Sequence, residues 1–120
     1  MKRFLALAAV ACLASCSFDD KPTGSGGKVS AVLTQDQAMK LASRGNCLAC
    51  HKLDGEMTGP AWREIGIRYG SDPKAAPAIA THIRNGGSFG WNMGFMPMRG
   101  GGSLSDQEID ALAQYIATLR

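Results

Sequence analysis

The pattern of hydrophobic and polar residues predicts four helices separated by long loops. The clearest helix lies near the C-terminal end, where Ser105 and Glu108 form a capping box. Apolar side chains follow it at helical spacing and define one face: Ile109, Leu112, Ala113, Ile116 and Leu119. A second capping box, Thr34 with Gln37, predicts a helix that runs to about residue 46.

Two shorter helices are predicted between these. Thr58 is the expected cap of a helix over 61–69, with a proline near its first turn. A third helix is expected from a cap at Asp72 to about Arg84, with Gly86 in the usual C-terminal position. Because no stretch alternates convincingly between apolar and polar positions, the sequence predicts an all-α fold.

Residues 1–15 have the pattern of an export signal. A basic start precedes an apolar run, Phe4–Ala14, that is too short to cross a bilayer as a helix. The segment Leu13–Cys16 resembles the bacterial lipobox, in which the cysteine is lipidated and becomes the mature N-terminus. An ordinary signal peptide that happens to carry a cysteine is the alternative. If the sorting rule of enteric bacteria applies, Ser17 favours the outer membrane.

The rest of the chain divides into a tether and one domain. Residues 16–30 are rich in Gly, Ser, Asp and Pro and read as a flexible tether with a reach of about 20 Å. Residues 31–120 form the predicted helical domain. From Cys16 onward there are 11 Lys and Arg against 10 Asp and Glu, with no basic block, so nucleic-acid binding is not indicated.

One motif in the domain carries chemistry. Cys47, Cys50 and His51 form Cys-x-x-Cys-His, which is typical of a c-type haem attachment site. Two thiols at this spacing can reach two vinyl groups on one porphyrin edge, and the histidine then serves as proximal iron ligand. Zinc would need more ligands than His82, the only other histidine, provides. A thioredoxin-like redox pair would need a βαβ pattern, and a disulfide across so short a loop would stabilise little.

The motifs, taken in order, resemble the small bacterial class I cytochromes c. They are RGNCLACH, TGPAW, IRNGG, GFMPM and LSDQEIDALAQYI, and the resemblance covers about residues 33–119. It implies the class I cytochrome c fold, about four short helices with long loops wrapped around one covalently attached haem c. It also implies an electron-transfer protein rather than an enzyme.

The resemblance assigns further roles. Pro60 is expected to offer its backbone carbonyl to Nδ1–H of the haem histidine. Gly45 is expected to pack closely against the terminal helix, at Tyr115 and Ile116. Arg84 and Trp91 resemble the family's donors to the haem propionates, although Trp91 stands two residues farther from the methionine loop than expected. A solvated charge at a helix end is the alternative reading of Arg84.

The loop of residues 90–103 offers three methionines as second axial ligand. Family members with Gly-x-x-Pro-Met use the methionine after proline, which here is Met98. Members with Met-Pro use the methionine before it, which selects Met96, and Arg99 replaces the proline that usually follows the ligand. Met98 is the predicted ligand, Met96 is the alternative and Met93 is the third candidate.

The predicted function is one-electron transfer by a monomer tethered to a membrane on the periplasmic side. Its expected partners are redox proteins of a bacterial respiratory chain: a quinol-oxidising complex, an oxidase or reductase, or a dehydrogenase. A dedicated cytochrome subunit of a periplasmic dehydrogenase, for example one for sulfur compounds, is the alternative. A haem-based sensor is a third reading, which would need a labile methionine ligand.

Overall fold

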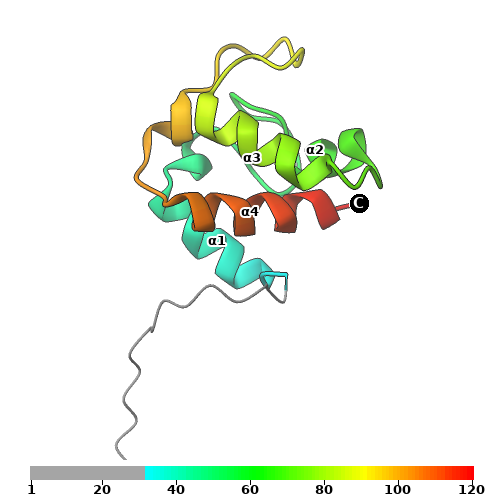
Figure 1. Cartoon of the computed structure of the whole chain (residues 1–120). Coiled ribbons are helices and arrows are strands. Elements are labelled where there is room, and N and C mark those ends of the chain that lie inside the picture. The colour runs from blue at the N-terminus through cyan, green and yellow to red at the C-terminus, as the bar shows by residue number, and fades with distance from the viewer. Residues whose placement is uncertain (1–31) are drawn as a thin grey trace, which may run out of the picture.

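The computed structural model describes residues 32–120, and this part of the chain is built from helices and loops (Figure 1). The helices are α1 (Gln35–Arg44), η1 (Cys47–Ala49), α2 (Trp62–Tyr69), α3 (Ala75–Asn85), η2 (Met98–Gly101) and α4 (Asp106–Thr118), where η marks a 3-10 helix. The only β-type pairing in this range is an isolated bridge between Gly87 and Met96. The all-α prediction is confirmed.

The predicted signal peptide (1–15) and tether (16–30), with Cys16, lie outside the described residues. Among residues 32–120, none of the helices has the length and apolar character needed to cross a membrane.

Both predicted capping boxes are present. The Thr34 hydroxyl accepts from the Gln37 N–H at 3.3 Å, and the Gln37 side chain accepts from the Thr34 N–H at 2.9 Å. Ser105 and Glu108 make the same reciprocal pair at 3.3 and 2.9 Å. Each box satisfies two N–H groups that a helix start leaves free, so α1 and α4 begin where local chemistry places them.

The starts of α2 and α3 differ from the predictions. The cap of α2 is Ala61 rather than Thr58, and the Glu64 carboxylate accepts its N–H at 3.3 Å. Asp72 does not begin α3; its carboxylate accepts the Lys74 N–H at 2.8 Å and holds a turn before the helix. The predicted C-terminal glycine is correct, because Gly86 has a φ of 68° that favours glycine.

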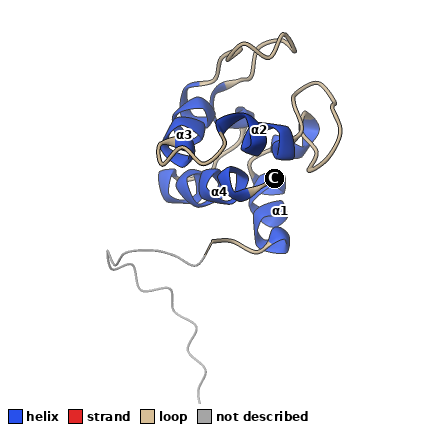
Figure 2. Ribbon diagram, turned by 90° about the vertical axis from the view of Figure 1, so that its right-hand side faces the viewer, coloured by secondary structure: helices blue, strands red, loops and turns tan. Residues whose placement is uncertain are grey.

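Helix α4 contacts α1, α2 and α3, and therefore organises the core (Figure 2). Four residues of its predicted apolar face, Ile109, Leu112, Ala113 and Ile116, are buried, and Tyr115 is buried beside them. Trp62 of α2 meets Tyr115 edge-to-face with ring centroids 6.4 Å apart.

The glycine contact with the terminal helix is made by a different residue from the one predicted. A Cβ at Gly45 would lie 2.7 Å from Leu104, so its nearest neighbour is Leu104 rather than Tyr115 or Ile116, the residues expected. The close approach to the end of α4 is instead made by Gly66 in α2. A Cβ there would lie 2.3 Å from the Leu119 carbonyl oxygen.

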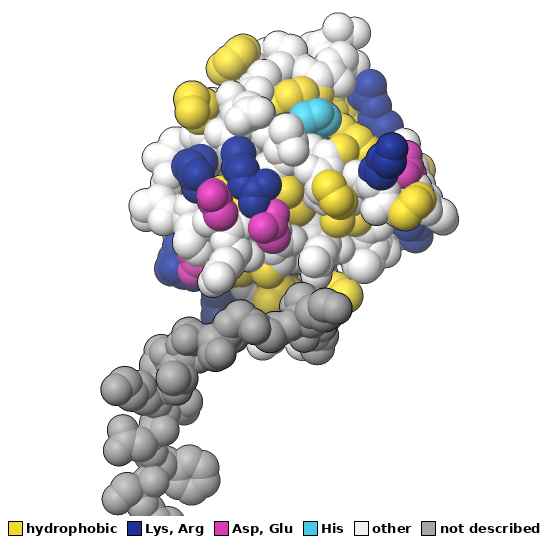
Figure 3. Space-filling view, viewed as in Figure 1, with side chains coloured by type: hydrophobic (Ala, Val, Ile, Leu, Met, Phe, Trp, Pro, Cys, Tyr) yellow, Lys and Arg dark blue, Asp and Glu magenta, His cyan; other side chains and the backbone are white. Residues whose placement is uncertain are grey.

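Ion pairs connect η2 and α3 to the start of α4. Asp106 accepts from Arg99 at 2.6 Å and from Arg84 at 3.4 Å, and Arg84 also binds Asp110 at 2.5 Å. Figure 3 shows basic and acidic side chains lying side by side on this face. Arg44 of α1 pairs separately with Glu108.

Candidate functional site

The Cys-x-x-Cys-His motif lies at the edge of an apolar cavity. Helix η1 begins at Cys47, and the His51 N–H donates to the Cys47 carbonyl at 3.0 Å, so one tight turn brings the three side chains together. Cys47, Cys50 and His51 all line the cavity. Cys47 is buried, which raises the pKa of its thiol. A raised pKa disfavours the thiolate that thiol redox chemistry requires.

The His51 imidazole is held by its surroundings in one orientation. Its Nδ1 lies 2.8 Å from the Pro60 carbonyl oxygen, and a carbonyl can only accept, so Nδ1 carries the proton. The lone pair is therefore on Nε2, the nitrogen left for a metal. Gly59 makes room for the ring, because a Cβ at that position would lie 2.6 Å from His51 Cε1. The Pro60 contact was expected, whereas the role of Gly59 was missed.

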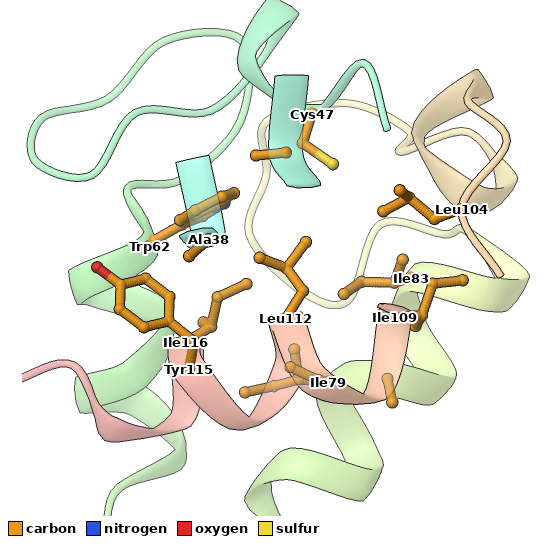
Figure 4. Packing of buried hydrophobic residues seen from close by; sticks show 13 residues of the cluster. Ala38, Cys47, Trp62, Ile79, Ile83, Leu104, Ile109, Leu112, Tyr115 and Ile116 are labelled. Carbon is orange, nitrogen blue, oxygen red and sulfur yellow. The ribbon is translucent and has the colours of Figure 1, made fainter. Parts of the chain in front are cut away.

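The cavity is apolar around this histidine. Figure 4 shows Leu112 projecting from α4 toward Cys47, which lies across the core, with Ile116 also on α4. The helical part of the lining also includes Trp62, Ile65, Ile79 and Ile83. Such a lining suits a large flat apolar group, since each side chain would lose water-exposed surface against it.

The loop between α3 and η2 also contributes to the cavity wall. Met93 and Met96 line the cavity, and Met96 is fixed by two backbone hydrogen bonds to Gly87, at 2.8 and 2.9 Å. Met98 starts η2, is 64% exposed and is not part of the lining. Two of the three candidates, Met93 and Met96, therefore lie at the cavity, whereas Met98, the predicted ligand, lies beside it.

The two predicted propionate donors lie in different surroundings. Trp91 lines the cavity, and the Arg68 guanidinium stacks on its ring at 4.4 Å from the centroid. Arg84 is not in the lining, and its guanidinium binds Asp106 and Asp110 of α4. The Arg84 guanidinium is thus engaged by carboxylates of α4, and both propionate roles stay predictions.

His82 belongs to the cavity wall. It is half-buried, its Nδ1 lies 2.8 Å from the Tyr69 hydroxyl oxygen, and its ring stacks on Phe89 at 3.9 Å. Burial and the nearby Arg68 lower the pKa of His82, which favours the neutral imidazole. No three His, Cys, Asp or Glu side chains within residues 32–120 come together as a metal site.

The residues at the cavity fit a c-type haem. The chain offers two thiols, a histidine with Nε2 free and its proton fixed on Nδ1, and an apolar pocket closed by a methionine-containing loop. Together with the helical fold, this donor set defines the class of monohaem class I cytochromes c.

Comparison with known proteins gives the family. The cytochrome c family model matches residues 35–120. Cytochrome c-552 of Nitrosomonas europaea is 38% identical over 80 residues, which are 67% of this chain and 76% of that protein. Cytochrome c-551 of Pseudomonas aeruginosa is 30% identical over 68% of this chain and 75% of its own. The crystal structure of the Nitrosomonas protein superimposes with a TM-score of 0.63 at 35% identity, covering 68% of this chain and 99% of that one.

The chain therefore belongs to the cytochrome c family and is a c-551/c-552-like electron carrier. Membership implies a single, covalently attached haem c, and it identifies an electron-transfer protein rather than an enzyme. When bound, the haem supplies an Fe(III)/Fe(II) couple. The protein's part is to attach the group, fix its ligands and exclude water from it.

Proposed function

We propose that the haem is attached through Cys47 and Cys50, that His51 and Met98 are its axial ligands, and that the protein carries single electrons between exported redox partners. The observation that carries the proposal is the hydrogen bond between His51 Nδ1 and the Pro60 carbonyl, at 2.8 Å inside the cavity. It leaves Nε2 as the basic nitrogen and holds the ring in one orientation. Fixed ligands of this kind suit a carrier, because the iron site need not rearrange when its charge changes.

The choice of Met98 over Met96 depends on the Gly94-Phe95-Met96-Pro97-Met98 sequence and its resemblance to Gly-x-x-Pro-Met loops. The side chain of Met98 points to solvent, so its sulfur enters the cavity only after the side chain turns inward. Met96 lines the cavity already and is the alternative ligand. Substituting Met98 and Met96 one at a time therefore distinguishes which of them binds the iron.

Purified protein is expected to show the spectrum of a haem with both axial positions filled. The oxidised form should have the weak far-red Met–Fe(III) charge-transfer band, and the reduced form should bind CO poorly, because no site on the iron is open. Visible spectra before and after CO addition measure both properties. Rapid and complete CO binding would instead favour a sensor with a labile methionine.

The proposed partners are membrane or exported redox proteins: a quinol-oxidising complex, a terminal oxidase or reductase, or a dehydrogenase. A free carrier should exchange electrons with such a partner after each has been purified separately. A dedicated dehydrogenase subunit should instead remain bound to its enzyme through purification.

Lipidation of Cys16 is proposed to hold the carrier at the membrane on the periplasmic side. Replacing Cys16 with serine should move most of the protein from the membrane to the soluble fraction, because the acyl chains that anchor it are then missing. Fractionation followed by immunoblotting measures the distribution, and Ser17→Ala is the matched control next to the lipid site. Continued membrane association of the Cys16→Ser protein would contradict a lipid anchor.

A further inference from the structure

We propose that Arg99 is a positioning residue for Met98: its guanidinium ties the chain directly after Met98 to the start of α4 and so limits how easily the sulfur leaves the iron. The inference builds on the proposed function, in which Met98 is the axial ligand. It concerns a residue that stands where the resembling family usually has proline.

The guanidinium of Arg99 holds two points of the chain at once. Nη1 donates to the Leu104 carbonyl at 2.9 Å, and Nη2 donates to the Asp106 carboxylate at 2.6 Å. Leu104 is buried beneath this contact. Arg84 donates to the same Asp106 oxygen at 3.4 Å and to Asp110 at 2.5 Å. The carboxylate therefore lies between two arginines, and it connects η2 and α3 with α4.

The backbone conformation at Arg99 and Gly100 allows the guanidinium to reach Leu104 and Asp106. Arg99 has a φ of 52°, in the left-handed region that a side chain with a Cβ rarely adopts. Gly100 follows with a φ of 64°, and its carbonyl accepts from the Asn46 side chain at 3.4 Å. A Cβ at Gly102 would lie 2.5 Å from the Gly45 carbonyl oxygen. The segment after Met98 is thus packed against the residues that precede the cysteine motif.

These contacts restrain the backbone after Met98, as a proline at this position would do through its ring. Proline restrains the chain by fixing φ, whereas Arg99 restrains it by hydrogen bonds from its guanidinium to Leu104 and Asp106, which follow the left-handed turn. When the backbone of Arg99 is held, the Met98 sulfur can move only by rotation of the Met98 side chain and by small movements of the chain at Pro97. Without that restraint, the whole segment can move away from the cavity, and the ligand would dissociate more often.

The test measures how fast imidazole replaces methionine on the ferric haem of the full chain, a rate limited by dissociation of the native ligand. Arg99→Asn keeps a residue that tolerates the left-handed turn but cannot reach Asp106. We expect it to bind imidazole about two- to five-fold faster, the effect of losing an exposed ion pair. Asp106→Asn should change the rate in the same direction. High salt should accelerate the wild type toward the variants, because the Debye length falls to about 3 Å at 1 M.

Arg44→Gln is the matched control. It removes another exposed arginine, one that pairs with Glu108 in the first turn of α4 rather than with Asp106. Its rate should equal that of the wild type. Equal acceleration in Arg44→Gln would overturn the proposal, since general loss of stability would then explain all three variants.

Two other outcomes separate this inference from the proposed function. If Arg99→Asn reacts at the wild-type rate while Met98→Ala loses the Met–Fe(III) band, Arg99 has no positioning role and the ligand assignment stands. If Met98→Ala keeps the band, the ligand assignment is wrong and the inference falls with it. The assignment of a single-haem carrier is unaffected by either result.

Discussion

Haem-free protein is expected to be largely unfolded. The double variant Cys47→Ala/Cys50→Ala cannot attach the haem, and extraction of any loosely held haem then gives the haem-free chain. Far-UV circular dichroism should show loss of most of the helical signal of the wild type, with no cooperative thermal transition.

The expectation follows from the composition of the core. Many of its buried residues are alanines, and Ile109 and Leu112 are the largest side chains that are fully buried in the described part of the chain. A domain of this size has only a modest core, so an apolar cofactor held in the cavity would supply a large share of the buried surface.

The matched control is the single variant Cys47→Ala, which keeps one attachment thiol and His51. It should retain haem and most of its helical signal, so the alanine substitution itself is not the cause of unfolding. A haem-free double variant with native-like dichroism and a cooperative melt would show that the helices fold without the cofactor.

The sequence predicts best those features that depend on neighbouring residues. The capping boxes at Thr34 and Ser105 are made within four residues, and the helices begin there as predicted. The predicted start of α3 was wrong because an Asp side chain can accept a hydrogen bond either at a helix start or in a turn. Asp72 accepts from Lys74 in a turn before the helix.

Contacts between distant segments could not be obtained from the pattern. Gly45 was assigned to the terminal helix, yet its nearest neighbour is Leu104, just before that helix, and Gly66 makes the close contact with α4. The ion pairs of Arg99 with Asp106 and of Arg84 with Asp110 carry no periodic signal. They appear only once η2, α3 and α4 are placed side by side.

Within the site, the cysteine motif was predictable because its three residues act within one turn. The Pro60 contact followed from resemblance to a family, since nothing local connects residues 51 and 60. The only sequence feature that could have indicated Gly59 is its position before that proline. Its role became visible only from the short distance between a Cβ at this position and the His51 ring.

Replacing Met98 with alanine is expected to abolish the Met–Fe(III) charge-transfer band and to lower the reduction potential. A thioether ligand favours Fe(II), so its loss favours the oxidised state. Axial ligands move haem potentials over about 0.8 V, and we expect a fall of roughly 0.1 V or more. Visible spectroscopy of the oxidised protein and a spectroelectrochemical titration measure the two effects.

Met96→Ala and Met93→Ala are the matched controls, because both remove a methionine that lines the cavity in the same loop. Each should keep the band, with a smaller change in potential from altered packing. Loss of the band in Met96→Ala alone would make Met96 the ligand, in agreement with its place in the cavity wall and its two hydrogen bonds to Gly87. Exposed Met98 would then be free of the iron, and the contacts of Arg99 would serve the fold rather than the ligand. The same three variants therefore decide both which sulfur binds the iron and whether the segment after Pro97 belongs to the redox site.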